Sequence, residues 1–562
     1  MREGCTMRSR YIPEENIRTS QIPTPFCNQR YLPLLRRKQF RFIQVTAVTF
    51  LLAGRHDERQ CGAARPHGPI EQFCHAATLG HCSPTGLSLP MLLFFVQTME
   101  RISRLLEKSR YSFCFRRFLG YKGWGNKNQP LHEVESSWYK THGRIYGRYE
   151  GIKPVLCVGE LSILRRIFIK DFLSFPNRRD MKFGDPVMDN TLFFLEDEPW
   201  KRVRNVVTPA FTTSKLKKMM VLLQTCCDTL VENLTKSSQT SEIINCQEIF
   251  GGFVIKPILE NPRLTLFCPI LMKIFRMKLL NPETTDFYRN IIIQVLEERK
   301  NTSLIFDDFL QVLLDAEESN NNGEDAICEK GSCQTKVNTG AKVQKKGLSY
   351  DELVSQCVTF FIAGFDATTS LLSHLVYRLA MNQQYQENVY NEMNEALAND
   401  DGTLTYNVLK DMKYLDAGIN ECLRLCPAMV RSERRTAHDC VIENEENGKG
   451  SIQVKKGTII SIPVYGIHHD PEWYPEPEEF RPERFYDEKP PPMAHLPFGE
   501  GQRICVGMRF VHMQVKLCLA KILMKFQILP APTTPKTLDF IEKRNILTVE
   551  KVEVLLKERS SS

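Results

Sequence analysis

Apolar residues recur at helical spacing over several long stretches of the chain. The most apolar stretch covers residues 349–380, with Phe360, Phe361 and Ile362 at its centre. The same period predicts further helices, at residues 160–173, 199–207, 281–299, 414–425 and 508–526, and the interval 216–313 is also helical in pattern. The chain is therefore expected to be mostly α-helical.

Strand-like patterns are few and short. Residues 139–149 and 153–158 lie on either side of a turn and predict a β-hairpin. Two more short strands are expected at residues 458–462 and 464–466. The predicted fold class is therefore mainly α with a small β lobe.

Residues 1–105 follow neither pattern. They carry scattered Arg, Pro, Gly and Cys, and their apolar runs at 42–52 and 87–96 are shorter than the roughly 18–20 residues that span a bilayer. No apolar core follows closely on the basic start, so no cleavable signal peptide is predicted. We expect an atypical, largely disordered extension, followed by one domain over residues 106–562. Within that domain, the polar segment 315–349 is expected to be an exposed linker.

The composition is that of a globular protein that can bury a large core, with 42% hydrophobic and 25% charged residues among 562. The net charge of +8 favours an acidic partner or an anionic membrane surface. No nucleic-acid-binding motif is present, so no nucleic acid is expected as a partner. The 19 cysteines include no Cys-x-x-Cys pair, which argues against a zinc ribbon. His468 and His469 have no partner at metal-binding spacing, so surface or turn positions are expected.

One cysteine stands in a distinctive motif. Residues 498–507 read Phe-Gly-Glu-Gly-Gln-Arg-Ile-Cys-Val-Gly, so a Gly-rich loop presents Cys505 just before a predicted helix. Helix N-termini favour a thiolate, and a thiolate can be the axial ligand of a haem iron. Arg503 can offer a guanidinium fork to a haem propionate, Gly507 permits close backbone approach to a flat ligand, and Phe498 would shield the sulfur. For a lone cysteine, the alternative is a buried free thiol in a turn.

The helix at 349–380 carries a second candidate site. Ala363 and Gly364 are small, so a flat ligand or O₂ can approach the helix backbone there. Asp366 and Thr368 follow directly and could relay protons as catalytic residues. The alternative is that these polar side chains bond back to helix carbonyls.

The spacing Phe-x-x-Gly-x-Arg-x-Cys-x-Gly in residues 498–507 resembles the haem-binding signature of the cytochrome P450 family at every fixed position. The resemblance covers about residues 110–556. It is strongest to the animal microsomal group that includes the family-3 drug and steroid monooxygenases and thromboxane synthase. It implies the cytochrome P450 fold, with haem b between the 349–380 helix and the loop of Cys505, which would be the iron ligand.

The resemblance also assigns roles to residues that spacing alone leaves open. Without it, Trp200 and Arg204, four apart on one helix, would more often be a packing pair. With it, haem-propionate contacts are implied for Trp200, Arg204, Arg434 and Arg503. A structural triad beneath the haem is implied for Glu421, Arg424 and Arg484. The substrate cavity would be lined by residues near 183–193, Phe361, Phe365, Met429, Val430 and residues 546–547.

The chain departs from the family pattern at several places. Ala367 stands where the oxygen-activation helix usually has a threonine, and Thr368 comes one residue later, rotated by about 100° around the helix. Proton delivery could then depend on water or on a substrate hydroxyl. The stretch 250–269 is short, without a counterpart to a core helix that forms part of the cavity roof. The Pro-rich hinge that follows an N-terminal membrane helix is also missing.

The resemblance implies a monooxygenase that inserts one oxygen atom from O₂ into a lipophilic substrate of the xenobiotic, steroid or fatty-acid type. No flavin or nicotinamide motif lies in the chain, so electrons from NADPH would come through NADPH–cytochrome P450 reductase, with cytochrome b5 as a further candidate partner. A basic patch could dock the acidic reductase, and its members are Lys201, Arg202, Lys215, Lys217 and Lys218. The expected location is the cytosolic face of the endoplasmic reticulum membrane, with a membrane surface as a partner.

Two alternatives of other classes remain at this stage. One is a haem-thiolate isomerase of the thromboxane-synthase type, which needs neither O₂ nor a reductase and which Ala367 makes less remote. The other is a haem-binding protein without catalytic activity.

Overall fold

The computed structural model describes most of the chain from residue 130 onward. The described residues are 130–150, 153–240, 242–250, 282–301, 309–321, 347–443, 451–541, 546–549 and 551–559. All of them belong to one unit, Arg110–Ser562. The predicted N-terminal extension, the stretch after residue 250 that was predicted to be short, and residues 322–346 of the predicted linker lie outside the described residues. The linker prediction is wrong for its first residues, because 315–321 belong to a helix and Glu317 is buried.

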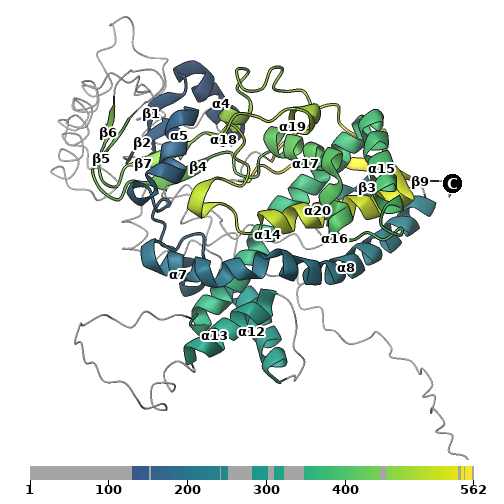
Figure 1. The fold of residues 1–562 in the computed structure, drawn as a ribbon, viewed down its shortest axis with the longest axis horizontal. Helices are drawn as coiled ribbons and strands as arrows, with labels where there is room; N and C mark the ends of the chain where they lie inside the picture. The colour runs from purple at the N-terminus through teal and green to yellow at the C-terminus, as the bar shows by residue number, and fades with distance from the viewer. Residues whose placement is uncertain are drawn as a thin grey trace, which may run out of the picture. The chain divides into compact units, whose positions relative to one another are not determined.

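Helices dominate the described part of the chain, as the sequence predicted (Figure 1). The α-helices are α4 (Leu131–His142), α5 (Leu161–Arg165), α6 (Pro186–Asp189), α7 (Asp197–Val207), α8 (Thr213–Gln239), α9 (Cys246–Phe250), α12 (Pro282–Asn301), α13 (Phe309–Asn321), α14 (Tyr350–Met381), α15 (Gln383–Ala398), α16 (Tyr406–Asp411), α17 (Lys413–Leu425), α18 (Val464–His468), α19 (Glu483–Tyr486) and α20 (Met508–Lys525). Short π or 3₁₀ turns are η1 (Arg166–Lys170), η2 (Phe172–Ser174), η3 (Thr208–Phe211) and η4 (Gly501–Arg503). Among the described helices, none combines the length and the hydropathy that a bilayer crossing requires.

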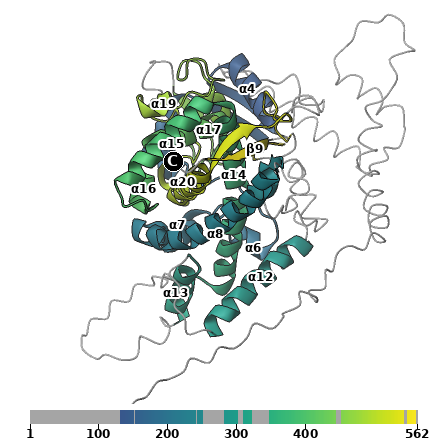
Figure 2. The ribbon, with the colours of Figure 1, turned by 90° about the vertical axis from the view of Figure 1, so that its right-hand side faces the viewer.

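The long helix α14 is central to the packing. A capping box fixes its start, because the Ser349 hydroxyl accepts from the Glu352 N–H and the Glu352 carboxylate accepts from the Ser349 N–H. Helices α6, α9, α12, α13, α15, α17 and α20 all contact α14. Figure 2 shows α15, α17 and α20 on one side of α7 and α8, and α12 and α13 on the other.

The strands of the described residues form three small sheets, with the orders β1-β2-β7-β4, β3-β9-β8 and β5-β6. The strands are β1 (Ile145–Glu150), β2 (Lys153–Val158), β3 (Ile244–Asn245), β4 (Ser432–Arg435), β5 (Cys440–Ile442), β6 (Ile452–Val454), β7 (Ile459–Ile462), β8 (Phe526–Pro530) and β9 (Glu553–Glu558). In the first sheet, β2 runs parallel to β7, and both the β1–β2 and β4–β7 pairs are antiparallel.

The predicted hairpin is confirmed, but its first strand begins later than expected. Residues 139–142 belong to helix α4, which ends where Gly143 adopts a φ of 79°. A glycine reaches that left-handed conformation at little cost, so the chain can turn there before β1 starts at Ile145. The predicted strand at residues 464–466 is wrong, because these residues begin helix α18.

The predicted helix at 160–173 is interrupted. Helix α5 passes into the π-helical turn η1 and then into the 3₁₀ turn η2. The periodic apolar residues are buried as expected, including Leu164 and Phe168. The wider π turn is a feature often found at functional sites. It places the Phe168 ring 4.8 Å from the Arg434 guanidinium of β4 and the Phe168 carbonyl against Gly501 in the loop that precedes Cys505.

The predicted structural triad is present and buried. Arg424 donates from Nε and Nη2 to the two oxygens of Glu421 at 2.7 and 2.8 Å, and Arg484 Nε lies 3.5 Å from Glu421 Oε1. Arg424 also donates to the carbonyl oxygens of residues 468, 477 and 479. Because buried ions are stable only when their hydrogen-bonding capacity is met, this triad is an architectural element.

The sequence predicts surface or turn positions for His468 and His469. His469 lies in the turn directly after α18, but a surface position is wrong for both, because both side chains are buried. His468 Nδ1 lies 3.1 Å from Arg424 O, and Leu496 N–H donates to its Nε2 at 2.8 Å. Burial lowers the pKa of both imidazoles. His468 therefore links the triad to the segment that leads to Cys505.

Candidate functional site

The loop of Cys505 is closed by backbone hydrogen bonds and by glycine. Cys505 N–H donates to Phe498 O at 3.0 Å. Gly499 and Gly501 have φ of 71° and 73°. At Gly501, a Cβ atom would lie only 2.0 Å from Phe168 O, whereas at Gly499 it would meet nothing within 4 Å. The loop is thus packed against η1 at a contact that only glycine permits.

The thiol of Cys505 lies three residues before α20 and is exposed to solvent. The protein around it raises its pKa, although hydrogen bonds from the Gly507 and Met508 amides and the charges of Arg204 and Arg178 oppose that effect. The amides act in the predicted direction, but desolvation by the protein atoms around the sulfur outweighs them, even though part of the residue remains exposed. A bound metal ion deprotonates a coordinating thiol outright, so an iron bound here would hold Cys505 as a thiolate.

Four arginines form a group at this thiol, and we call them the cationic cluster: Arg178, Arg204, Arg434 and Arg503. The charges of Arg178 and Arg204 act on the thiol, and the charge of Arg178 also acts on Arg434 and Arg503. Burial lowers the pKa of each guanidinium, to about 10 for Arg178 and about 9 for Arg503. Repulsion from its neighbours in the cluster lowers the pKa of Arg178, Arg434 and Arg503 further. Within the described residues, none of the four forms an ion pair with a carboxylate. The cluster is therefore suited to a ligand that carries negative charge.

Arg503 and Arg434 are held in place by neutral groups. Arg503 donates to Pro176 O at 2.6 Å, to Leu195 O at 3.0 Å and to Asn177 Oδ1 at 2.9 Å. Arg434 donates from Nη1 to the Glu433 carbonyl at 2.9 Å, and its buried Nε has no partner in the described part of the chain. Each guanidinium keeps N–H groups for a further acceptor.

Arg178 is the member that the sequence did not reveal. It lies in the loop between η2 and α6, stacks over the Phe193 ring at 4.2 Å and donates to Phe193 O at 3.2 Å. The only sequence signal was the pair Arg178-Arg179 in a loop otherwise rich in Pro, Gly and Asp. Arg178 comes close to the Cys505 thiol only through the tertiary structure, and the local sequence pattern does not predict that contact.

Helix α7 supplies Trp200 and Arg204 on one face, as their spacing predicted. Trp200 is buried against Phe172, with ring centroids 6.0 Å apart, and Arg503 stacks on its ring at 4.2 Å. Within the described residues, neither the Trp200 indole N–H nor the Arg204 guanidinium makes a hydrogen bond. Both remain available as donors beside the thiol.

The centre of α14 is open at its small residues. Ala363 and Gly364 are exposed, and a Cβ atom on Gly364 would meet nothing within 4 Å. Ala367 and Asp366 are half-buried, whereas Thr368 is only 4% exposed and its hydroxyl has no partner among the described residues. The one-residue shift noted in the sequence therefore places Thr368 in the packed side of the helix.

The predicted cavity residues are described only in part, since the side chains of Phe361 and Phe365 lie outside the described set. Val430 and Leu547 are buried in one small cluster. Met429 is 39% exposed and pairs with Ile546 through a β-bridge. The segment after residue 546 thus lies beside the turn that follows α17.

These donors fit haem b. Its two propionates match a cluster of arginines that forms no ion pair with a carboxylate of the described residues, although the charges of Glu196 and Asp197 act on Arg503. The cluster also includes the buried Nε of Arg434, which has no partner in that part of the chain. The haem iron accepts a thiolate, and the flat ring of the haem suits a site bordered by glycines. The chemistry of these residues is thus compatible with a haem-thiolate site.

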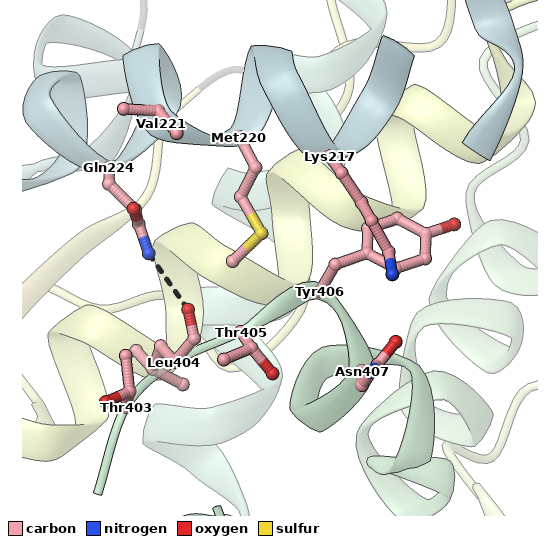
Figure 3. Close-up of a pocket in the computed structure, with 9 residues that line it drawn as sticks. All are labelled: Lys217, Met220, Val221, Gln224, Thr403, Leu404, Thr405, Tyr406 and Asn407. Carbon is pink, nitrogen blue, oxygen red and sulfur yellow. Dashed lines mark hydrogen bonds between the residues drawn. The ribbon is translucent and has the colours of Figure 1, made fainter. Parts of the chain in front are cut away.

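A pocket of about 300 Å³ lies elsewhere, between α8 and α16 (Figure 3). Gln224 donates across it to Leu404 O at 2.9 Å, and the Lys217 ammonium lies 5.8 Å from the Tyr406 ring centroid. It is lined by Lys217, Met220, Val221, Gln224 and residues 403–407. Lys217 belongs to the predicted basic patch, but none of the predicted catalytic or haem-binding residues lines this pocket, so it is not the candidate active site.

The predicted basic patch loses one member. Arg202 is half-buried, forms a two-pronged ion pair with Glu352 and donates to Gly347 O at 2.6 Å. It therefore braces the start of α14. Lys201 is exposed and lies 3.8 Å from Glu198, while Lys217 and Lys218 are exposed on α8.

Comparison with known proteins identifies the family of this chain. The Cytochrome P450 family matches residues 115–317 and 256–556. The chain belongs to the cytochrome P450 family, and its fold and haem cofactor follow from that membership. It is an enzyme of the monooxygenase class.

Several curated relatives are similar over most of their length. Cytochrome P450 3A25 of Mus musculus is 32% identical, with 76% of this chain and 88% of the relative covered. Cytochrome P450 3A5 of Homo sapiens is 31% identical over 76% of this chain and 87% of the relative. Lithocholate 6-beta-hydroxylase of Mesocricetus auratus is 30% identical over 76% and 86%. The predicted resemblance to the animal family-3 group is confirmed.

Proposed function

We propose that this monooxygenase holds haem b through Cys505 and the cationic cluster and acts on a lipophilic substrate with electrons from NADPH. The observation that carries the proposal is the cluster itself. Four arginines that form no ion pair with a carboxylate of the described residues are grouped at one thiol before α20, and two of them, Arg178 and Arg204, act on it directly. Isolated buried cations are costly, so an anionic ligand at this place would stabilise the protein.

Each part of the site has a task. Haem b, when bound, supplies the O₂ chemistry. The Cys505 thiolate donates electron density to the iron, and the Gly507 and Met508 amides stabilise its charge. Arg178, Arg204, Arg434, Arg503 and the Trp200 indole orient the propionates. The segment at Phe498 is fixed by its carbonyl, which accepts from Cys505 N–H.

Proton delivery would start at Asp366, the half-buried acid next to the open stretch of α14. Ala367 offers no hydroxyl, and the Thr368 hydroxyl is buried. Water or a hydroxyl of the substrate would then complete the path. We therefore give Asp366 the proton-transfer role and assign Thr368 a place in packing.

The substrate is proposed to be a lipophilic molecule of the xenobiotic, steroid or fatty-acid type. One relative is named for the hydroxylation of lithocholate, which supports hydroxylation of a lipophilic molecule as the reaction class. Helix α14 belongs to a large cluster of buried apolar residues, so the protein around the site is apolar, as a lipophilic substrate requires.

Electrons are proposed to come from NADPH–cytochrome P450 reductase, with cytochrome b5 as a second donor, at the endoplasmic reticulum membrane. Helix α8 supports this partner, because it combines exposed lysines with exposed apolar side chains. Val221 and Leu222 are 63% and 60% exposed beside Lys217 and Lys218. Such a surface suits an acidic protein, since opposite charges speed encounter.

The isomerase alternative is favoured by one observation, the lack of an available hydroxyl at Ala367 and Thr368. A reaction without proton delivery to oxygen does not require a hydroxyl at this place. Labelled oxygen separates the two functions. With ¹⁸O₂, NADPH and a reductase, we expect one ¹⁸O atom in the product of a lipophilic probe. Turnover of an endoperoxide without NADPH and without ¹⁸O uptake would contradict the proposal.

A further inference from the structure

A second group of charged residues lies beside the cationic cluster, and we call it the balanced network. It contains three arginines and three glutamates: Arg148, Arg179, Arg431, Glu135, Glu150 and Glu433. All are buried or half-buried, with side-chain exposures from 0% for Glu135 to 17% for Glu433. Unlike the cationic cluster, this group carries no net charge.

Glu150 on β1 is the centre of the balanced network. Arg148, Arg179 and Arg431 donate to its carboxylate at 2.8, 2.6 and 2.7 Å. Burial alone would raise the pKa of this carboxyl, but the three guanidinium charges lower it. Arg148 also makes a two-pronged pair with Glu135 of α4 at 2.7 and 2.8 Å.

Arg179 extends the network to β4. It donates from Nε and Nη2 to the two oxygens of Glu433 at 2.8 and 2.9 Å. The same loop is joined to β4 by its backbone, because Arg435 N–H donates to Asn177 O at 2.7 Å. Arg178, a member of the cationic cluster, lies between these two attachments.

The two charged groups meet at β4, an edge strand of the sheet β1-β2-β7-β4 (Figure 1), which carries Glu433 of one group and Arg434 of the other. Glu433 pairs with Ser461 of β7, and Arg148 donates to the Ser461 hydroxyl at 3.3 Å, so Arg148 and Glu433 share one face. Arg434 pairs with Ile460 and stacks on Phe168 at 4.8 Å on the other face. Because side chains alternate along a strand, adjacent residues Glu433 and Arg434 serve different groups.

This separation has a physical consequence. A glutamate on the face of Arg434 would neutralise the arginines and compete with the carboxylates of a ligand. The acids are instead held across the sheet by arginines of their own. Buried ion pairs add little net stability compared with apolar packing. We therefore expect the balanced network to position the neighbouring arginines of the cationic cluster rather than to stabilise the fold.

We propose that the balanced network is a positioning device for the haem propionates. Through Arg179, it fixes Arg178 and Arg434 in place, and it keeps the buried acids away from them. The inference rests on the proposed haem site. Arg179 and Glu433 act through Arg178 and Arg434 and are positioning residues.

The test measures the rate at which the full-length haem-loaded protein loses haem to an excess of a haem-binding globin. Arg178→Gln should accelerate the loss, and Arg179→Gln should do so by a similar factor, about 10- to 100-fold, as for other supporting groups of metal sites. The two changes together should add little to either alone. The spectrum of the remaining bound haem should keep its thiolate signature, because the Cys505 loop is untouched.

Two further variants keep the test decisive. Arg179→Gln combined with Glu433→Gln leaves two arginines and two glutamates, so the network stays neutral and the fold is protected. It should still lose haem quickly, because Arg178 has lost its anchor. Arg144→Gln is the matched control. Arg144 binds Asp470 at 2.9 Å in another cluster and should leave haem loss unchanged.

The outcomes separate this inference from the proposed function. If the wild-type protein binds no haem through a thiolate, or if Arg178→Gln has no effect, the proposed site is wrong. If Arg178→Gln accelerates haem loss but the neutral double variant does not, the site stands and the positioning role is overturned.

Discussion

At the scale of single residues, two glycines of the Cys505 loop meet different constraints. Gly499 and Gly501 both have positive φ, but only Gly501 also touches another backbone, at Phe168 O. The loop therefore depends on Gly501 for its position against η1 as well as for its conformation.

Replacing these glycines should separate the two effects. An alanine in the left-handed region costs about 1–2 kcal/mol, and this is all that Gly499→Ala should lose. Gly501→Ala adds a Cβ 2.0 Å from Phe168 O, so it should lower stability further and reduce the thiolate-bound haem fraction. Thermal unfolding and the absorption spectrum check this. Equal losses in the two variants would show that the contact with η1 does not matter.

Two neighbouring side chains of α14 should respond in opposite ways. Thr368→Val removes a buried hydroxyl that has no partner among the described residues, so stability should hold or rise, by up to about 1–3 kcal/mol, with turnover unchanged. Asp366→Asn should lower turnover on the order of 10²-fold or more if this acid transfers the proton. Steady-state turnover and urea unfolding measure both. Loss of activity in Thr368→Val with Asp366→Asn intact would reverse the assignment.

At the scale of elements, buried histidines make one region sensitive to acid. Burial lowers the pKa of His469 and His495 to about 3, while in the unfolded chain a histidine has a pKa of about 6.5. Between these values the unfolded state binds protons that the folded state excludes. The stability contribution is therefore complete above about pH 6.5 and is lost as the pH falls.

This difference in pKa predicts how steeply the free energy of unfolding falls as the pH is lowered. Each such histidine should lower the free energy of unfolding by about 1.4 kcal/mol per pH unit below pH 6.5. His469→Asn should flatten the decline relative to the wild-type protein, because the variant has one fewer group to protonate. Urea unfolding between pH 7 and pH 5 gives the slopes. Parallel curves for the two proteins would mean that His469 titrates alike in both states.

Strong apolar periodicity made the main helices predictable. The predicted helices at 199–207, 349–380 and 414–425 differ from α7, α14 and α17 by two residues or fewer. Helix α4 was missed because polar residues lie on its buried side, including His132 and Glu135. The π turn η1 was also missed, since one added residue in a turn leaves no mark in the pattern.

The candidate site was predictable where a motif held it. Cys505 and Arg503 lie within one loop, and Trp200 and Arg204 lie on one helix turn. Arg178 could not be found, because it reaches the thiol only through folding. Arg202 was placed in the basic patch for the same reason, since its partner Glu352 is 150 residues away in the sequence.

At the scale of the whole molecule, the family match falls in two overlapping parts, 115–317 and 256–556. The proposed haem site combines residues from both ends of this match, Arg178, Trp200 and Arg204 from the first range and Arg434 and Cys505 from the second. All of them belong to one structural unit, so the cationic cluster forms only when that unit is folded.

Docking of the reductase belongs to this scale too. Lys217→Glu on α8 should raise the KM for the reductase about twofold to fivefold, as expected for one exposed ion pair, and the effect should shrink at high salt. Lys153→Glu is the control, because this exposed lysine lies on β2, remote from α8 in Figure 1. Equal effects of the two changes would argue against docking on α8.

The central claim is that Cys505 ligates a haem iron in a folded site. The most direct measurement is the difference spectrum of the reduced full-length protein with carbon monoxide, beside that of Cys505→Ser. We expect the wild-type protein to show the long-wavelength Soret band of a thiolate-bound haem and the variant to lose it. A wild-type band at the shorter wavelength of haem without a thiolate, or no haem at all, would contradict the account.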